Sequence, residues 1–208
     1  MHAAVDAARR MDMVRHGMDT PVHEEDRIMS RIAEEVGFVH LRVHSAFSLL
    51  EGALPLKKLI ALAEADRMPA LGIADTGNLF GALEYAGKVA EKGIQPIVGC
   101  QVAIDFADVP EDSRPNASHR ERGMGDLVLI AASEQGYWNL VKLVSDSFMQ
   151  TATDMRAHVG VDALAEHHEG LIVLTGGPGG PVNRALVAGR TDLAKARLDA
   201  LAKIFGDR

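Results

Sequence analysis

The sequence contains a single cysteine, Cys100, among its 208 residues. An internal disulfide and a thiolate zinc site both need more than one cysteine, so neither can be built from this chain. Long apolar runs are also missing, because the longest ones, such as residues 127–132 and 171–174, fall far below the ~20 residues that a membrane-spanning helix needs. We therefore expect no membrane helix, and a reducing, cytoplasmic setting.

Basic runs are absent as well, and 29 acidic against 22 basic residues give a net charge of −7. Since affinity for duplex DNA comes largely from Lys and Arg that neutralise phosphates, any contact with nucleic acid has to be local or made through a partner. The first residues mix Arg with Asp and lack an apolar core segment, which argues against a secretory signal. What is present fits one globular domain, with 47% hydrophobic and 25% charged residues.

Residues 1–36 hold five of the nine Met residues and no strand pattern, and we expect a poorly packed or partly helical tail. From residue 37 onward, apolar strand patterns alternate with helix patterns, which predicts a largely parallel sheet, doubly wound or closed into a barrel. We expect strands at residues 38–44, 70–75, 95–106, 126–132 and 170–176, and helices at residues 56–67, 79–92 and 133–149, from 182 onward, and from an N-cap at Thr191 to about 205. The loop at about 107–125, rich in Pro, Gly, Ser and charge, is expected to be mobile.

Polar residues follow several of these strands, at the strand ends where α/β folds gather their sites. They are Arg42 and His44, Asp75 and Thr76, Gln101, and the glycine-rich segment 176–180. A hydrolytic metal cluster would need His and carboxylate ligands here, whereas Arg42 introduces a permanent cation. The glycine-rich segment lacks the Gly-Lys-Ser/Thr ending of a nucleotide-binding loop, so we interpret it as a tight strand-to-helix turn.

Two segments, FVHLRVHSAFSLLEGALPLKKLI (38–60) and ALGIADTGNLFGALEYAGKVAEKGIQPIVGCQV (70–102), closely resemble the N-terminal polymerase and histidinol phosphatase (PHP) domain of bacterial replicative DNA polymerase III alpha subunits. Later matches are DLVLIAASEQGYWNLVKLVS and EGLIVLTGGPGGPVNRAL, so the resemblance covers residues 37–208 in register. It implies an α/β fold of the PHP type, a distorted (β/α)7 barrel that is incomplete at the C-terminus. Because an incomplete barrel leaves a strand edge exposed, we expect the 208-residue chain to be marginally stable or self-associating.

The resemblance also implies a vestigial metal site. Arg42 stands at the first position of the family's His-x-His pair and His44 keeps the second. The remaining positions hold one retained acid and four replacements, and the whole set is Arg42, His44, Glu51 (for Asp), Asp75 (retained), Thr76 (for His), Gln101 (for Glu) and Asp126 (for His).

These replacements remove lone pairs and negative charge from the site. We therefore expect an inactive, structural site without metal, in which Arg42 forms an ion pair with Glu51 or Asp75. A residual single-metal site is the alternative.

The resemblance implies that this chain is one segment of a longer polymerase. In full length the family performs template-directed DNA synthesis with Mg²⁺ held in a downstream palm domain, and no candidate palm lies within these 208 residues. The segment alone is then an inactive scaffold that supports the polymerase body, docks a separate proofreading 3′–5′ exonuclease subunit, and meets DNA only through the full-length protein. The alternative is a free-standing PHP metal-dependent phosphoesterase, which Arg42, Thr76 and Gln101 disfavour. Whether residues 1–30 are the natural start stays open.

Overall fold

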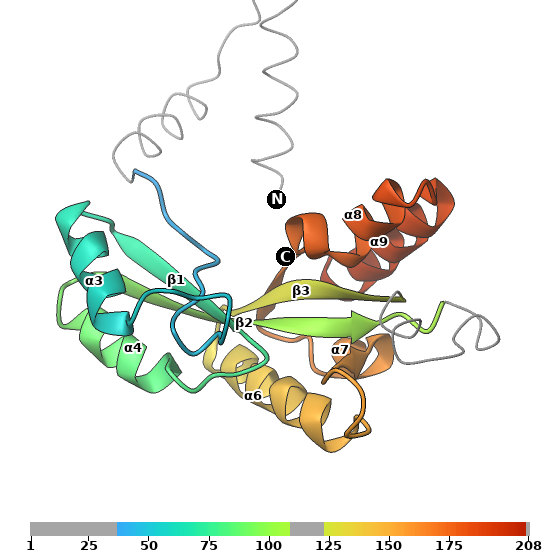
Figure 1. The fold of residues 1–208 in the computed structure, drawn as a ribbon, viewed down its shortest axis with the longest axis horizontal. Helices are drawn as coiled ribbons and strands as arrows, with labels where there is room; N and C mark the ends of the chain where they lie inside the picture. Colours follow the sequence, from blue (N-terminus) through green and yellow to red (C-terminus); the bar gives the residue numbers. More distant parts are fainter. Residues whose placement is uncertain (1–36, 109–122, 207–208) are drawn as a thin grey trace, which may run out of the picture.

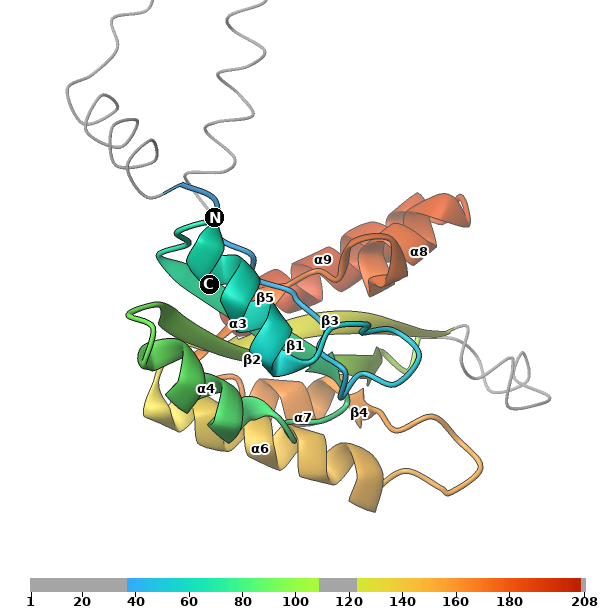
Figure 2. The same ribbon diagram turned by 60° about the vertical axis from the view of Figure 1, so that its left-hand side comes forward.

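The computed structural model describes residues 37–108 and 123–206, so the predicted tail and most of the predicted loop lie outside the described residues. The described strands form one sheet in the order β1-β2-β3-β5, and a two-residue strand, β4 (Val159–Gly160), pairs with β2. The long strands are β1 (Ala70–Thr76), β2 (Gln95–Asp105), β3 (Met124–Ala131) and β5 (Leu171–Leu174). Figures 1 and 2 show α4 and α6 on one side of this sheet, and α9, which follows α8, contributes Leu201 and Phe205 to the same buried cluster as Leu140 of α6.

The sheet is mixed, so the prediction of a largely parallel sheet is wrong for β3. β1 and β2 run parallel with Thr76 opposite Gln101, but β3 is antiparallel to both β2 and β5. An apolar pattern determines which side chains face the core and not which way the strand runs. Met124 and Gly125 already belong to β3, so the predicted loop also ends earlier than expected.

The predicted first strand at residues 38–44 is reduced to one isolated bridge, which joins Val43 to Ile73 of β1. Val43 N donates to Gly72 O at 3.2 Å and Ala74 N donates to Val43 O at 2.8 Å. A Cβ on Gly72 would lie 2.7 Å from Leu41 O, so glycine permits this close approach. The segment therefore runs alongside β1 without forming a full strand.

Five helices agree with the prediction in position and differ at their ends, and α7 has no counterpart in the prediction. α3 (Leu56–Ala65) follows Pro55, and α6 (Glu134–Met149) begins at Ser133, whose Oγ accepts from Gly136 N at 3.1 Å. α4 (Ala82–Ala90), α7 (Val161–Glu166), α8 (Pro181–Val187) and α9 (Thr191–Phe205) complete the set. Arg190, and not Thr191, occupies the N-cap of α9, and no side chain caps it. Within the described ranges, no helix is both long and apolar enough to cross a membrane.

The two faces of the sheet differ in character. On one face Cys100, Val102 and Ile104 of β2 pack with Leu127 and Leu129 of β3, and α6 and α7 contribute Leu140, Leu143 and Leu164 to the same cluster. Side chains alternate along a strand, so Gln101 and Ala103 belong to the other face. Thr76 lies opposite Gln101, and Asp126 lies opposite Ala103. Three of the predicted site residues thus start from the same face.

Candidate functional site

Arg42 connects three of the strand ends that the sequence singles out. Its Nε and Nη2 atoms donate to Gln101 Oε1 at 3.0 and 2.5 Å, and its Nη1 donates to Gly176 O at 3.4 Å. Gln101 is 5% exposed, whereas Arg42 is exposed. The guanidinium therefore lies over a buried amide and ties the segment before β1 to β2 and to the turn after β5.

The predicted ion pair between Arg42 and Glu51 or Asp75 is wrong. Asp75 lies opposite Cys100 in the β1–β2 register, whereas Thr76 lies opposite Gln101. Successive side chains on a strand point to opposite faces. Asp75 therefore starts from the face opposite to Gln101, and Arg42 contacts Gln101. The predicted site is therefore divided into smaller groups.

Asp75 forms the first of these groups with the residues after His44. Its carboxylate is buried and accepts hydrogen bonds from Ser45 N at 2.6 Å, Ser45 Oγ at 2.7 Å and Ser48 Oγ at 2.5 Å. Three donors satisfy most of the hydrogen-bonding capacity of a carboxylate. Asp75 therefore anchors the loop that follows His44 and has little capacity left for a ligand.

His44, Glu51 and Thr76 form a second group, which shares Ser48 with the first, because Ser48 Oγ lies 3.2 Å from His44 Nδ1 and accepts from Thr76 N at 3.1 Å. Thr76 Oγ1 donates to Glu51 Oε2 at 2.5 Å, and His44 Nδ1 lies 3.4 Å from each of these two oxygens. Glu51 is about half exposed at 48%. In the part of the chain that the structure describes, no three His, Cys, Asp or Glu side chains come together in a group that could hold a metal ion.

Asp126 forms the third group, with a residue that the sequence did not single out. Arg156 Nη2 donates to Asp126 Oδ1 at 2.6 Å, with side chains 36% and 16% exposed. A second guanidinium thus occupies a position where the resemblance implies metal ligands.

The glycine-rich turn lies beside Asp126. Gly176 and Gly177 have φ of +80° and +60°, and a Cβ on Gly176 would lie 1.8 Å from Asp126 O. Gly177–Gly179 form a short 3-10 helix and Gly180 precedes α8. The prediction of a tight strand-to-helix turn is confirmed.

Ser45, Ser48 and Arg156 are the site residues that sequence reasoning missed. A buried acid at the end of an apolar strand needs hydrogen-bond donors, so the two serines of SAFS, which directly follow His44, could have been considered by asking which groups satisfy Asp75. Arg156 lies in a stretch without a periodic pattern, and the sequence contains no comparable signal for it.

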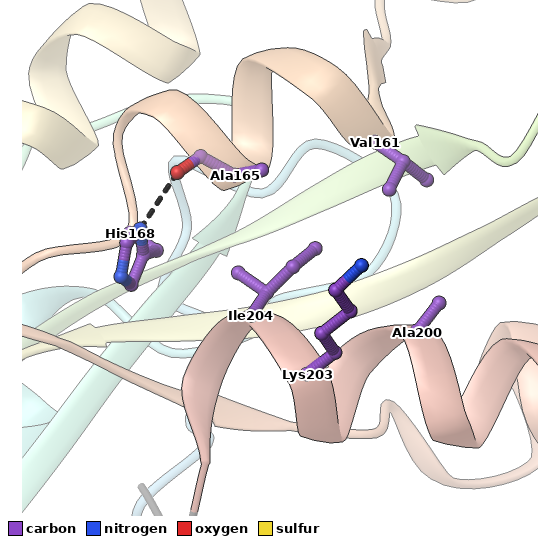
Figure 3. Close-up of a pocket in the computed structure, with 6 residues that line it drawn as sticks. All are labelled: Val161, Ala165, His168, Ala200, Lys203 and Ile204. Atoms are coloured by element: carbon purple, nitrogen blue, oxygen red, sulfur yellow. Dashed lines mark hydrogen bonds between the residues drawn. The ribbon is translucent and has the colours of Figure 1, made fainter.

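Two pockets lie near these elements. One of about 520 Å³ lies between the segment around Arg42 and α3, and His44, Glu51, Leu59 and Leu62 line it. The other, of about 430 Å³, lies between α7 and α9, and Val161, Ala165, His168, Ala200, Lys203 and Ile204 line it (Figure 3). His168 Nδ1 donates to Ala165 O at 2.7 Å. This second pocket contains none of the predicted site residues.

The comparisons with known proteins agree with the resemblance. The PHP domain family model matches residues 40–208. Three curated relatives are each named DNA polymerase III subunit alpha: those of Caulobacter vibrioides (43% identical over 177 residues, 85% of this chain and 15% of the relative), Rickettsia felis (37% over 172 residues, 82% and 13%) and Thermus aquaticus (36% over 179 residues, 85% and 14%). The chain thus spans 13% to 15% of the length of these relatives and matches their N-terminal PHP segment.

Similarity to solved structures is weaker. An amidohydrolase from Chromobacterium violaceum is 16% identical, with a TM-score of 0.37 over 78% of this chain and 54% of that chain. This similarity is too low to support an argument about fold or chemistry. On the family match and the relatives, the chain belongs to the PHP domain family and is similar to the N-terminal PHP segment of DNA polymerase III alpha subunits.

Proposed function

We propose that this chain is the N-terminal PHP segment of a DNA polymerase III alpha subunit and works as a scaffold within a cytoplasmic replicase. The support is 43% identity over 177 residues to a relative of that name. In the full-length protein, template-directed synthesis and its Mg²⁺ belong to a downstream polymerase domain. The partners of the segment are the remainder of that chain, the proofreading exonuclease subunit and other replicase subunits, with DNA bound through the whole protein.

The proposed architecture is a PHP-type distorted (β/α)7 barrel, to which the described strands contribute part of the wall. The face of the sheet that carries Thr76, Gln101 and Asp126 would form its interior, because α4 and α6 lie on the opposite side of the sheet (Figure 2). Barrel interiors of this size are filled by side chains. Arg42 and Arg156 reach Gln101 and Asp126 on this face and supply such filling.

The proposed site is degenerate, and the contact between Arg42 and Gln101 is the observation that carries this proposal. A guanidinium has no lone pair to give to a metal, and an amide oxygen does not supply the negative charge that a divalent cation needs. Asp75 is engaged by Ser45 and Ser48, which leaves His44 and Glu51 as the nearest pair of donors. These residues do not fit the multinuclear metal cluster of an intact PHP site.

An activity assay on the full-length subunit tests the proposal. We expect primer extension on a primed template with Mg²⁺, and no hydrolysis of p-nitrophenyl phosphate or of a single-stranded primer with Zn²⁺ or Mn²⁺. Hydrolysis that is lost in both His44→Ala and Asp126→Ala would support the phosphoesterase alternative and overturn the scaffold. Phe80→Ala, at an exposed position away from these contacts, is the matched control.

A further inference from the structure

The loop at residues 45–54 has a base that is buried and fixed. Ser45 and Ser48 are 0% and 2% exposed, and the hydroxyl groups of both donate to the buried carboxylate of Asp75. An isolated β-bridge pairs Ser45 with Leu54, which brings the two ends of the loop together. The base can therefore move only if several buried hydrogen bonds break, which is costly.

The tip of this loop, residues 49–51, is exposed and strained. Leu49 is 81% exposed and Leu50 is fully exposed, so the core holds neither side chain. Leu50 has a φ of +67°, which lies in the left-handed region that is unfavourable for a residue with a side chain of this size. Such strain persists in a native structure only where other contacts hold it, and it is concentrated in functional and switching segments.

The side chain of Glu51 supplies a contact that holds the tip. Its Oε2 atom accepts from Thr76 Oγ1 at 2.5 Å and lies 3.4 Å from His44 Nδ1. The Glu51 side chain is 48% exposed, so water competes for the same hydrogen-bond donors. Segments that open locally are held by exposed hydrogen bonds of this kind, whereas the buried bonds to Asp75 keep the base closed.

Glu51 also forms part of the wall of a pocket. The pocket of about 520 Å³ between this loop and α3 is lined by Glu51 and His44 on one side and by Leu59 and Leu62 of α3 on another. A movement of the tip away from Thr76 would carry the carboxylate of Glu51 away from His44. The charge and the shape of this wall of the pocket thus depend on the conformation of the tip.

We propose that residues 49–51 are a switch segment that opens and closes one wall of this pocket, with Leu50 as the strained hinge and the contact between Thr76 and Glu51 as the latch. In the closed form the latch holds Leu50 at its positive φ. Release of the latch lets Leu50 return to a favourable conformation, while the base of the loop stays on Asp75. A group that competes with Glu51 for the hydroxyl of Thr76 shifts the population toward the open form.

Hydrogen exchange of the full-length protein, followed by mass spectrometry, tests this switch. Thr76→Val removes the hydroxyl donor and keeps the shape of the side chain, and we expect exchange at residues 49–53 to become about tenfold faster. Two amides in this range donate to Ser48 O at 3.0 and 2.8 Å and report the opening. Exchange at residues 43–48, which include the base, should stay the same.

Two matched variants accompany Thr76→Val. Thr76→Ser keeps the hydroxyl donor and should exchange as the wild type does. Thr191→Val makes the same change at an exposed position at the start of α9 and should leave residues 49–53 unaffected. Leu50→Asn tests the hinge separately, because Asn tolerates a positive φ better than Leu does. This variant should slow exchange at residues 49–53 by about threefold, after correction for intrinsic exchange rates.

Three results would overturn the proposal. Unchanged exchange at residues 49–53 in Thr76→Val would show that the contact with Glu51 is no latch. Equally faster exchange at residues 43–48 and 49–53 would show that the loop opens as a whole, without a fixed base. If Thr76→Val loosens the entire fold, which faster exchange in β2 would reveal, Leu50→Asn decides, and exchange equal to that of the wild type would show that Leu50 is no hinge.

Discussion

At the scale of single residues, Arg42 meets a neutral amide oxygen and a backbone carbonyl in place of a carboxylate. A hydrogen bond to a charged group is worth about 1.5–3 kcal/mol when shielded and less in water. Because Arg42 is exposed and Gln101 is buried, the contact stabilises the fold mainly by satisfying Gln101 Oε1.

Replacing Arg42 with Ala is therefore expected to lower the free energy of unfolding by about 1–2 kcal/mol, the cost of a buried acceptor that loses its donor. This is less than the ~3–5 kcal/mol expected for breaking a buried ion pair. Urea unfolding of the wild type and of Arg42→Ala measures this change in free energy, and Lys57→Ala, at an exposed position, is the control. A loss of the larger size would show that Arg42 pairs with a carboxylate after all, and no loss would show that the contact is unimportant.

A substitution of Leu50 is expected to raise the free energy of unfolding, where Arg42→Ala lowers it. Asn tolerates a positive φ better than Leu does, so Leu50→Asn is expected to raise the free energy of unfolding by up to about 1 kcal/mol. Leu49→Asn, at a neighbouring exposed position without positive φ, is expected to bring no such gain. Thermal unfolding compares the two. Equal midpoints for both variants would show that Leu50 is not strained.

Cys100 is expected to be inert in the native protein. It is fully buried, and this burial raises the pKa of its thiol to about 12. Thiolate is the reactive form, so at pH 8 both access and ionisation are lacking. A chromogenic disulfide reagent should therefore react with no thiol in the folded chain and with one thiol per chain in urea. Rapid labelling of the folded chain would show that β2 opens readily.

At the scale of elements, local patterns predicted where the longer helices and strands lie, but they missed the short β4 and α7 and did not show how the strands pair. α6 was predictable because Ser133 caps it and its apolar residues recur with helical spacing. The direction of β3 was not predictable, since a parallel and an antiparallel buried strand have the same apolar pattern. Nor did the alternation at residues 38–44 reveal that this segment pairs with β1 through a single isolated bridge, at Val43.

The candidate site shows the same limit. The resemblance assigned Arg42, Thr76 and Gln101 to one site, and the register places Thr76 beside Gln101. The resemblance could not give the hydrogen-bond partner of each polar group. Those partners depend on the face from which each side chain starts and on distances of a few ångströms. Asp75 therefore binds Ser45 and Ser48, which the sequence did not single out.

α9 is fixed by one buried cation. Arg197 forms two hydrogen bonds of 2.7 Å to Asp108 and donates to the carbonyls of Gly123 and Pro181 at 2.9 Å each. Its guanidinium also lies 5.1 Å from the centre of the Phe106 ring. Since Arg197 is 3% exposed, its contacts are shielded from water. They join α9 to β2, to the start of β3 and to the start of α8.

Arg197→Met is accordingly expected to lower the free energy of unfolding by about 3 kcal/mol, because Asp108 and two carbonyl groups lose their donor. Exposed Arg190→Met, just before the same helix, is expected to change it by less than ~0.5 kcal/mol. Denaturant unfolding of both variants checks the difference. Equal effects would contradict the anchoring role of Arg197.

At the scale of the whole molecule, the two faces of the sheet carry side chains of different kinds. On one side, guanidinium groups of Arg42 and Arg156 contact Gln101 and Asp126. On the other face, Cys100, Val102 and Leu127 pack with side chains of α6, α7 and α9 in the apolar core. A scaffold needs a stable interior and a recognisable exterior, and neither needs a metal ion. The central claim is therefore that the site has lost its metal.

The metal content of the full-length subunit tests this claim most directly. Protein purified without chelators and dialysed against metal-free buffer is analysed for zinc, manganese and iron by mass spectrometry, with His44→Ala as the matched variant. The account predicts far less than one equivalent attributable to the PHP segment, and the same value for wild type and variant. Stoichiometric metal in the wild type that is lost in His44→Ala would contradict it.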